Sequence, residues 1–196
     1  MAGPIRRVVT GHDRNGKAVV ISDGPPAAGK TNPLRPGHVS TDLWRTRVMP
    51  VPIPSEEPDA TVPRPLNNFP SPNGTVVRIS EIPPDSDAVR NLDPGKSREI
   101  FRSYGNENAS TFGRGGRHPL MHRTESVDYV VVLDGEITMI LDEVDVPLKT
   151  GDVVIQRGTN HAWSNRSGKP CRMLYVLIDG EFDLELAALL ETGPDP

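Results

Sequence analysis

The stretch GPPAAGKT, residues 24–31, has the G-x-x-x-x-G-K-[ST] spacing of a phosphate-binding loop. In such a loop a strand leads into backbone N–H groups that surround the phosphates, and a helix begins at the lysine and the hydroxyl residue. The preceding KAVVISDG has the apolar run of a strand. After Thr31, however, Pro33, Pro36 and Gly37 prevent a regular helix. We therefore interpret the stretch as a turn and expect no nucleotide cofactor.

Histidine is the other residue type here that could do chemistry near neutral pH. The chain has five histidines, and three of them, His118, His122 and His161, lie in or beside a β-rich region that starts near residue 117. Such a residue is either a ligand or substrate contact, or a core histidine with satisfied hydrogen bonds. The spacing of the surrounding residues favours the first interpretation for His122 and His161.

The segment GDVVIQRGTNHAWSN carries the most specific of these spacings. It supplies Gly151, then Gly158, two residues, His161, three residues and Asn165. This pattern resembles the second motif of the cupin superfamily. It differs in a strand one residue shorter and in Gln-Arg where a proline is common.

The segment upstream resembles the first cupin motif, which is a glycine-rich lead, His-x-His, three or four residues, Glu, six residues and Gly. The stretch GRGGR matches the glycine-rich lead. Counting back from Gly135, Asp128 stands at the Glu position and His122 at or within one residue of the first histidine. Thr124 then occupies the position of the second histidine. The resemblance covers about residues 75–180.

The resemblance implies an all-β fold, the cupin double-stranded β-helix or jelly-roll barrel. Short apolar strands broken by Asp-Gly, Thr-Gly and Ser-Gly turns indicate the same class. We predict an N-terminal extended arm with a β-hairpin over residues 1–74, a cupin barrel over 75–182, and a C-terminal helix and tail over 183–196.

Sixteen of the 21 prolines lie before residue 95, so the N-terminal half of the chain is rich in turns. Two β-rich runs around Asn15 and Gly16 predict a hairpin, and this pair favours a type I′ turn. DLWRTRVM is expected to be an edge strand and SREIFRSYG a short helix. DLELAALLE is helical by period and composition, with an apolar leucine stripe.

Alternate side chains of a strand share one face, so Asp128 should point into the barrel with Val130 and Val132. By the resemblance, His122, Asp128 and His161 form a 2-His-1-carboxylate site. Such a site suits a divalent transition metal, Fe, Mn, Ni or Zn, whose identity the sequence leaves open. Without a metal, Asp128 would need another partner, because a buried lone carboxylate is costly.

Other residues are expected around this site. Trp163 is expected to form a pocket wall, and Gln156 and Thr124 to supply polar contacts. His118 is expected to be either a loop residue or a fourth ligand. Tyr129 should face outward on its strand, and Arg117 and Arg123 either orient an anionic substrate or only solvate a loop.

Three functions follow from this set of residues. The first is a metal-dependent enzyme, a lyase or oxidoreductase acting on a small oxygen-rich molecule by dehydration, isomerisation, decarboxylation or dioxygenation. The second is a metal-free dehydratase in which His122 and Asp128 act as an acid–base pair. The third is a non-enzymatic barrel that binds a small ligand.

Composition narrows the class of protein. The net charge of −4 over 196 residues argues against a nucleic-acid partner, and no apolar run is long enough to span a membrane. The single Cys171 fits a reducing compartment, and the N-terminus lacks a secretory signal, so we expect a cytoplasmic protein. Exposed barrel edges need cover, so we also expect a homodimer that exchanges its N-terminal arms.

Overall fold

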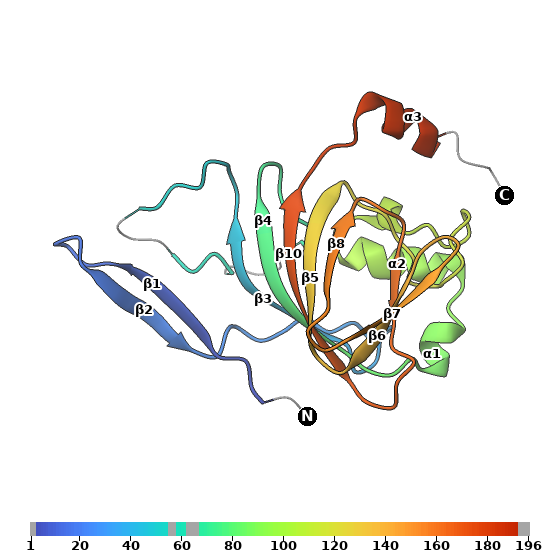
Figure 1. Cartoon of the computed structure of the whole chain (residues 1–196), viewed down its shortest axis with the longest axis horizontal. Helices are drawn as coiled ribbons and strands as arrows, with labels where there is room; N and C mark the ends of the chain where they lie inside the picture. Colours follow the sequence, from blue (N-terminus) through green and yellow to red (C-terminus); the bar gives the residue numbers. More distant parts are fainter. Residues whose placement is uncertain (1–2, 55–57, 62–66, 192–196) are drawn as a thin grey trace.

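The computed structural model describes residues 3–54, 58–61 and 67–191. Two antiparallel sheets form the main body (Figure 1). The larger has the order β3 (Val39–Thr46), β4 (Thr75–Ile82), β10 (Cys171–Asp179), β5 (Ser126–Asp134) and β8 (Val153–Arg157). The smaller has the order β7 (Asp145–Lys149), β6 (Glu136–Ile140) and β9 (Ala162–Ser164). The all-β jelly-roll prediction is confirmed.

The two sheets pack face to face around one apolar core. Alternation along β5 buries Asp128, Val130 and Val132 and leaves Tyr129 exposed, as predicted. Side chains from both sheets meet in the core, which is formed by Ile82, Val130, Val132, Ile137, Met139, Trp163, Cys171, Met173 and Tyr175. The inner face of β5 is therefore apolar at Val130 and Val132 and polar at Ser126 and Asp128.

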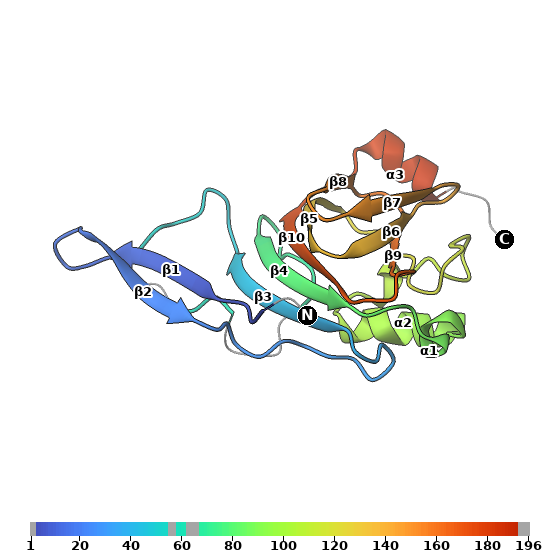
Figure 2. The same ribbon diagram turned by 60° about the horizontal axis from the view of Figure 1, so that its bottom comes forward.

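The predicted N-terminal hairpin is present as β1 (Arg7–His12) and β2 (Ala18–Gly24), and it projects away from the barrel (Figures 1 and 2). Its turn is not type I′, which needs a positive φ at both central residues. Gly16 has φ +74°, but among the described non-glycine residues only Asn73 has a positive φ. The Asp13 carboxylate instead accepts hydrogen bonds from the backbone N–H groups of Asn15 and Lys17, which stabilise a wider loop.

The N-terminal arm and the barrel share a sheet. β3 is an edge strand, as predicted, and it pairs along its length with β4. Residues 39–46 therefore belong to the barrel, although the predicted boundary lies at residue 74. Part of the proline-rich segment, residues 55–57 and 62–66, falls outside the described residues.

The stretch GPPAAGKT lacks the local structure of a phosphate-binding loop. β2 ends at Gly24, and no helix occurs between it and β3. Lys30 instead pairs with Ser40 through an isolated β-bridge, with backbone hydrogen bonds of 2.7 and 2.9 Å. The segment thus adds a bridge to the edge of the barrel.

A small helical layer covers one open side of the barrel (Figure 2). It contains α1 (Asp87–Arg90), α2 (Pro94–Ser103) and the 3₁₀ helix η1 (Glu107–Ala109). The helix predicted for SREIFRSYG is α2, and it begins earlier, at Pro94. Asp93 caps it by accepting a hydrogen bond from the Lys96 N–H at 2.9 Å, and Pro94 suits the first turn of a helix. Val89, Leu92, Ile100 and Leu120 form a separate apolar cluster in this layer, and Leu34 and Tyr104 pack against it.

The predicted C-terminal helix is α3 (Leu184–Glu191), but it buries none of its side chains. Its predicted leucine stripe stays largely exposed, and Leu184 is 91% exposed. The tail, residues 192–196, lies outside the described residues.

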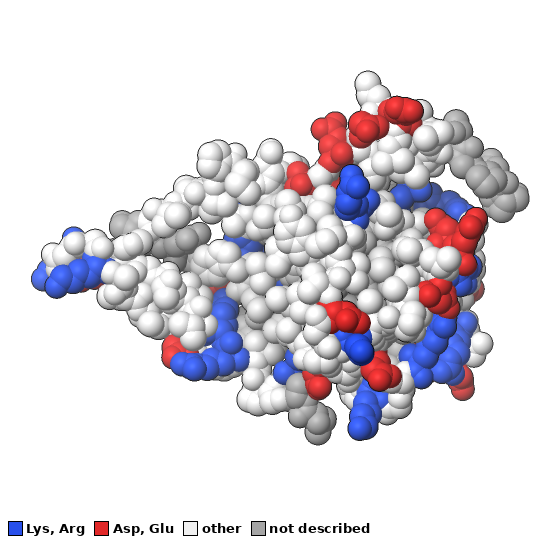
Figure 3. All heavy atoms as spheres, in the orientation of Figure 1, with Lys and Arg blue, Asp and Glu red and all other residues white. Residues whose placement is uncertain are grey.

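The visible surface carries its charge unevenly (Figure 3). Charged side chains lie around the rim and at the hairpin tip, whereas the outer face over β10, β5 and β8 is largely uncharged. Exposed apolar residues on this face include Val153 and Ile155. In the described part of the chain, none of the helices has the length and hydropathy needed to cross a membrane.

Candidate active site

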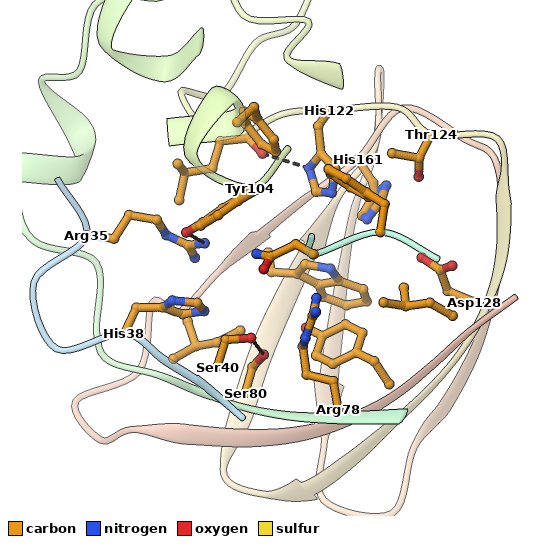
Figure 4. A pocket seen from close by; sticks show the side chains of 18 residues that line it. Arg35, His38, Ser40, Arg78, Ser80, Tyr104, His122, Thr124, Asp128 and His161 are labelled. Carbon is orange, nitrogen blue, oxygen red and sulfur yellow. Dashed lines mark hydrogen bonds between the residues drawn. The ribbon is translucent and has the colours of Figure 1, made fainter. Parts of the chain in front are cut away.

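A cavity of about 110 Å³ lies between the inner face of the large sheet and the helical layer (Figure 4). Its lining combines aromatic, cationic and hydroxyl side chains with two histidines and one carboxylate. The polar lining residues are Arg35, His38, Ser40, Asn68, Arg78, Ser80, Tyr104, His122, Thr124, Asp128, His161 and Tyr175. The cavity therefore contains His122, Asp128 and His161, the three residues on which the predicted site depends.

His122 and His161 lie side by side. Two backbone hydrogen bonds of 2.9 Å join them in an isolated antiparallel bridge, and their ring centroids are 4.3 Å apart. Residues 39 positions apart in the chain are thus held by the backbone itself, with both rings in the cavity wall.

The hydrogen bonds at Nδ1 orient both rings. His122 Nδ1 lies 3.0 Å from the Leu120 carbonyl oxygen, and His161 Nδ1 lies 3.0 Å from the Thr159 carbonyl oxygen. A carbonyl oxygen can only accept, so we assign the ring proton of both histidines to Nδ1. The lone pair of each Nε2 is then left for a substrate or a metal.

Gln156 supports this arrangement from behind. It is buried, and its Nε2 donates to the Thr159 carbonyl oxygen at 2.8 Å, beside His161 Nδ1 at 3.1 Å. It is absent from the residues that line the cavity. Gln156 was predicted to supply a polar contact in the pocket; in the structure its amide instead contacts the loop that carries His161.

Both histidines are neutral at pH 7. Burial lowers the pKa of His161 to about 4, and the Thr159 carbonyl oxygen opposes this shift only in part. Burial, together with the neighbouring His161, lowers the pKa of His122 well below its usual range. The pair therefore presents hydrogen-bond acceptors to the cavity.

Asp128 is a buried carboxylate that is not fully hydrogen-bonded. It is 5% exposed, and its Oδ1 has no hydrogen-bond partner among the described residues. Burial raises its pKa to about 6, although a hydrogen bond from Ser126 and the charge of Arg78 act in the opposite direction. A native protein rarely leaves such an atom unpaired, so this oxygen calls for a partner such as a water molecule, an ion or a ligand.

These side chains match a metal site only in part. The Nδ1 hydrogen bonds to backbone carbonyls are the usual support of metal-binding histidines. However, in the part of the chain that the structure describes, no group of three or more His, Cys, Asp or Glu side chains is arranged to hold a metal. The predicted triad of His122, Asp128 and His161 is therefore not assembled. Asp128 has one methylene fewer than the Glu of the family motif. Thr124 stands where that motif has its second histidine.

Aromatic side chains form the rest of the wall. Trp163 lies edge-on to His161 with ring centroids 5.7 Å apart and to Tyr175 with centroids 6.0 Å apart. Phe101 of α2 lies 4.8 Å from the ring of His122, centroid to centroid. The structure thus places Trp163 in the wall, as predicted, and encloses the histidine pair in apolar surface.

Three predicted contacts lie elsewhere. His118 does not line the cavity, because its Nδ1 accepts the Leu120 N–H at 3.1 Å in a turn. Arg117 donates to the carbonyl oxygens of Leu141 and Val144, and Arg123 donates to that of Leu190. Thr124 does line the cavity, and its hydroxyl lies 3.0 Å from that of Ser126.

The cationic lining comes from residues that sequence analysis did not single out. Arg35 precedes β3, His38 lies at its start, and Arg78 lies on the inner face of β4. In Figure 4, Arg35, His38, Ser40 and Ser80 occupy one side of the cavity, and Thr124 and Asp128 the opposite side. The one signal in the sequence is a charged residue within an apolar strand, where Arg78 shares a face with Val76.

The comparison with protein families identifies the central part of the chain. Residues 110–177 match the family model Cupin_2, described as a cupin domain. This match and the jelly-roll fold support a small cupin-type protein, in which residues 110–177 are the matched cupin domain.

Curated relatives match part of the chain. Phomopsin biosynthesis cluster protein C′ of Diaporthe leptostromiformis is 54% identical over 70 residues, which are 35% of this chain and 37% of that protein. The cupin-domain-containing oxidoreductase fogC of Aspergillus ruber is 37% identical over 102 residues, 48% of this chain and 47% of that protein. The alignments thus span less than half of either relative.

A solved structure with similarity over nearly the whole chain is the Cnp3 cupin domain of Schizosaccharomyces pombe. It is 12% identical, covers 97% of this chain and 96% of that chain, and has a TM-score of 0.43. Similarity at this level carries no inference about function.

Proposed function

We propose that this protein is an enzyme that transfers protons on a small oxygen-bearing molecule, and that its reaction is the elimination of water. The observation that carries this proposal is Asp128, a buried carboxylate with an unpaired oxygen in the same cavity as two neutral histidines. A carboxylate whose pKa is raised to about 6 is mostly ionised at pH 7 and is a stronger base than an ordinary aspartate.

In this reaction Asp128 acts first as base and then as acid. Its carboxylate takes a proton from the carbon next to a carbonyl group, and the electrons of that C–H bond form the new C=C bond. The C–O bond on the following carbon breaks, and the departing hydroxyl takes the proton from the Asp128 carboxyl as water leaves. The carboxylate is thereby regenerated, and no further reactant is needed.

The histidines position the substrate in this reaction. With Nδ1–H held by backbone carbonyls, the Nε2 atoms of His122 and His161 accept hydrogen bonds from substrate hydroxyl groups. The aromatic wall of Phe101, Tyr104 and Trp163 limits the access of water to the reacting carbon.

A metal-assisted reaction is the second candidate, and the anchoring of both histidines through Nδ1 favours it. His122 and His161 would hold the ion, which would supply Lewis-acid polarisation of a substrate oxygen. The described residues offer no third His, Cys, Asp or Glu ligand, so this site would depend on substrate or water for its other positions.

The named relatives support an enzyme of small-molecule metabolism. One belongs to a biosynthesis cluster, and others are called cupin-domain-containing oxidoreductases. We extend from them only the general setting, a biosynthetic enzyme.

The test uses 3-hydroxy-3-phenylpropanoate and its amide as probes in D₂O. Wild-type protein should release cinnamate or cinnamamide, or should exchange deuterium at the carbon next to the carbonyl, both measured by ¹H NMR. Asp128→Asn should lose at least about a hundredfold in rate, the usual contribution of a positioned base. Asp134→Asn, an exposed position on the same strand, should not change the rate.

Metal content and chelation separate the two candidates. Activity that Asp128→Asn leaves intact would contradict the proposal. Activity lost on chelation and restored by one divalent ion would favour the metal-assisted reaction. Tight binding of a metabolite with neither turnover nor exchange would instead indicate a ligand-binding barrel.

A further inference from the structure

A buried cluster of positive charge lies beside the cavity. Asp42, whose side chain is fully buried, faces Arg78 Nε at 2.7 Å, Arg45 Nη2 at 3.1 Å and Lys30 Nζ at 3.6 Å. Burial lowers the pKa of Lys30 to about 8, and the two arginines add to this effect while Asp42 opposes it. Lys30 is still mostly protonated at pH 7, and arginine is always charged. Three positive charges therefore share one carboxylate.

Arg78 brings part of this excess charge to the cavity. Its side chain is 8% exposed, and its Nη2 has no hydrogen-bond partner among the described residues. Arg78 lines the cavity, and its guanidinium projects between the two sides seen in Figure 4. A buried charged donor left unpaired is costly, so its position calls for an acceptor from a ligand.

The neighbouring side chains extend this polar side of the cavity. Arg35 also lines it, and its Nη1 donates to the Tyr104 hydroxyl at 3.2 Å. The hydroxyls of Ser40 and Ser80 lie 3.3 Å apart on the same side. His38 adds no charge, because burial, with Arg35 and Arg78 nearby, lowers its pKa well below its usual range.

We propose that this side of the cavity is an anion subsite, formed by Arg78 and Arg35, which binds the carboxylate of a small aromatic or apolar acid. The subsite rests on the proposed function, because it orients the rest of such an acid toward Asp128 and the histidines. A carboxylate can accept two parallel hydrogen bonds from a planar guanidinium, and the aromatic wall can pack against the apolar part of the acid. A cavity of about 110 Å³ limits the ligand to a small molecule.

The proposal also accounts for the lysine of GPPAAGKT. Lys30 does not line the cavity, and its Nζ donates to the Asn68 side-chain oxygen at 3.0 Å behind the arginines. There its charge adds to the positive potential around Asp42. The lysine of this stretch thus contributes charge near the subsite, although the stretch itself does not form a phosphate-binding loop.

Calorimetric titration of the full-length protein at pH 7 tests the subsite with two probes, 3-phenylpropanoate and its uncharged amide. Wild-type protein should bind the acid at least about tenfold more tightly than the amide, since a hydrogen bond between charged groups is stronger than one between neutral groups. Equal affinities for the two probes would overturn the proposal.

Two variants test the residues. Arg78→Lys keeps the charge but removes Nη2, and it should bring the two affinities to within about threefold of each other. Arg35→Gln changes a half-buried side chain, so folding is less at risk, and it should reduce the preference for the acid by at least about threefold. Circular dichroism shows whether each variant is folded. A folded Arg35→Gln protein that retains the whole preference would contradict the role of Arg35, and a folded Arg78→Lys protein that retains it would overturn the subsite.

Asp128→Asn separates this proposal from the proposed function. The substitution should abolish turnover but preserve or strengthen binding of the acid, because it removes a negative charge from the same cavity. Failure of turnover in wild-type protein with a preserved preference for the acid would contradict the proposed function alone. Loss of the preference in Asp128→Asn, with no effect of Arg78→Lys, would contradict the subsite.

Discussion

The substitution Asp128→Asn should make this protein more stable at neutral pH. Asparagine has nearly the same shape as aspartate but no charge to bury. In the wild-type protein the Asp128 carboxylate is 5% exposed and its Oδ1 has no partner among the described residues. Its ionised form therefore destabilises the fold, and the substitution removes this cost.

The expected magnitude follows from the pKa. Burial raises the pKa of Asp128 from 3.8 to about 6, a difference of roughly two units, and each unit corresponds to about 1.4 kcal/mol. Well below pH 3.8 the group is protonated in both the folded and the unfolded protein and has no effect. As the pH rises from 4 to 6, the unfolded chain ionises first, so the wild-type protein loses about 3 kcal/mol that the variant retains.

Urea unfolding followed by circular dichroism between pH 4 and 8 measures this difference. Near pH 4 the free energies of unfolding of the two proteins should differ by less than about 1 kcal/mol. At pH 7 the variant should be more stable by about 3 kcal/mol, or by roughly 6–12 °C in melting temperature. Because the buried histidines change the stability of both proteins, the difference between them at each pH is the quantity to compare. Asp134→Asn on the same strand is the matched control and should change little.

Two outcomes would refute the reasoning. A difference that does not vary with pH would show that Asp128 titrates alike in the folded and unfolded chains. A variant less stable than the wild-type protein at pH 7 would show that the carboxylate has a partner that stabilises its ionised form.

Three further predictions concern other parts of the molecule. Burial keeps His161 neutral down to about pH 4, whereas the same residue in the unfolded chain takes up a proton near pH 6.5. The wild-type protein therefore loses stability as the pH falls between these values. In urea unfolding, His161→Gln should lose about 3 kcal/mol less over this range. Gly158 has φ +60°, and a Cβ at this position would lie 2.4 Å from the Phe182 ring. Gly158→Ala should therefore lower the free energy of unfolding by more than about 1 kcal/mol. An unchanged free energy of unfolding would show that this turn relaxes freely. We also propose that the projecting hairpin packs on a second copy of the chain, where the Val20 side chain, 59% exposed, would be covered. Light scattering should give a dimer for the wild-type protein and a monomer for Val20→Asp. A monomeric wild-type protein would contradict this proposal.

Local patterns predicted most of the fold. Period-two alternation identified the inner face of β5, turn residues identified the hairpin, and Asp93 with Pro94 explains where α2 begins. The participation of β3 in the barrel was less predictable. It depends on pairing with β4 across a proline-rich segment, and no local pattern encodes such a pairing.

The sequence identified the two histidines of the candidate site but not its arginine Arg78. The frame around His161 and the spacing to His122 identified two residues that the backbone joins directly. The metal triad was not predictable in detail, because the reach of Asp128 depends on the backbone path between residues 122 and 128. Arg78 was missed because both faces of β4 carry apolar residues, so its alternation does not tell which face is inward.

The most direct test of the central claim is a ¹³C NMR titration of the Asp128 carboxyl group in the folded protein, assigned by its absence in Asp128→Asn. We expect this carboxyl group to titrate with a pKa near 6. A pKa near 4 would show an ordinary, well-solvated carboxylate and would contradict its role as the base.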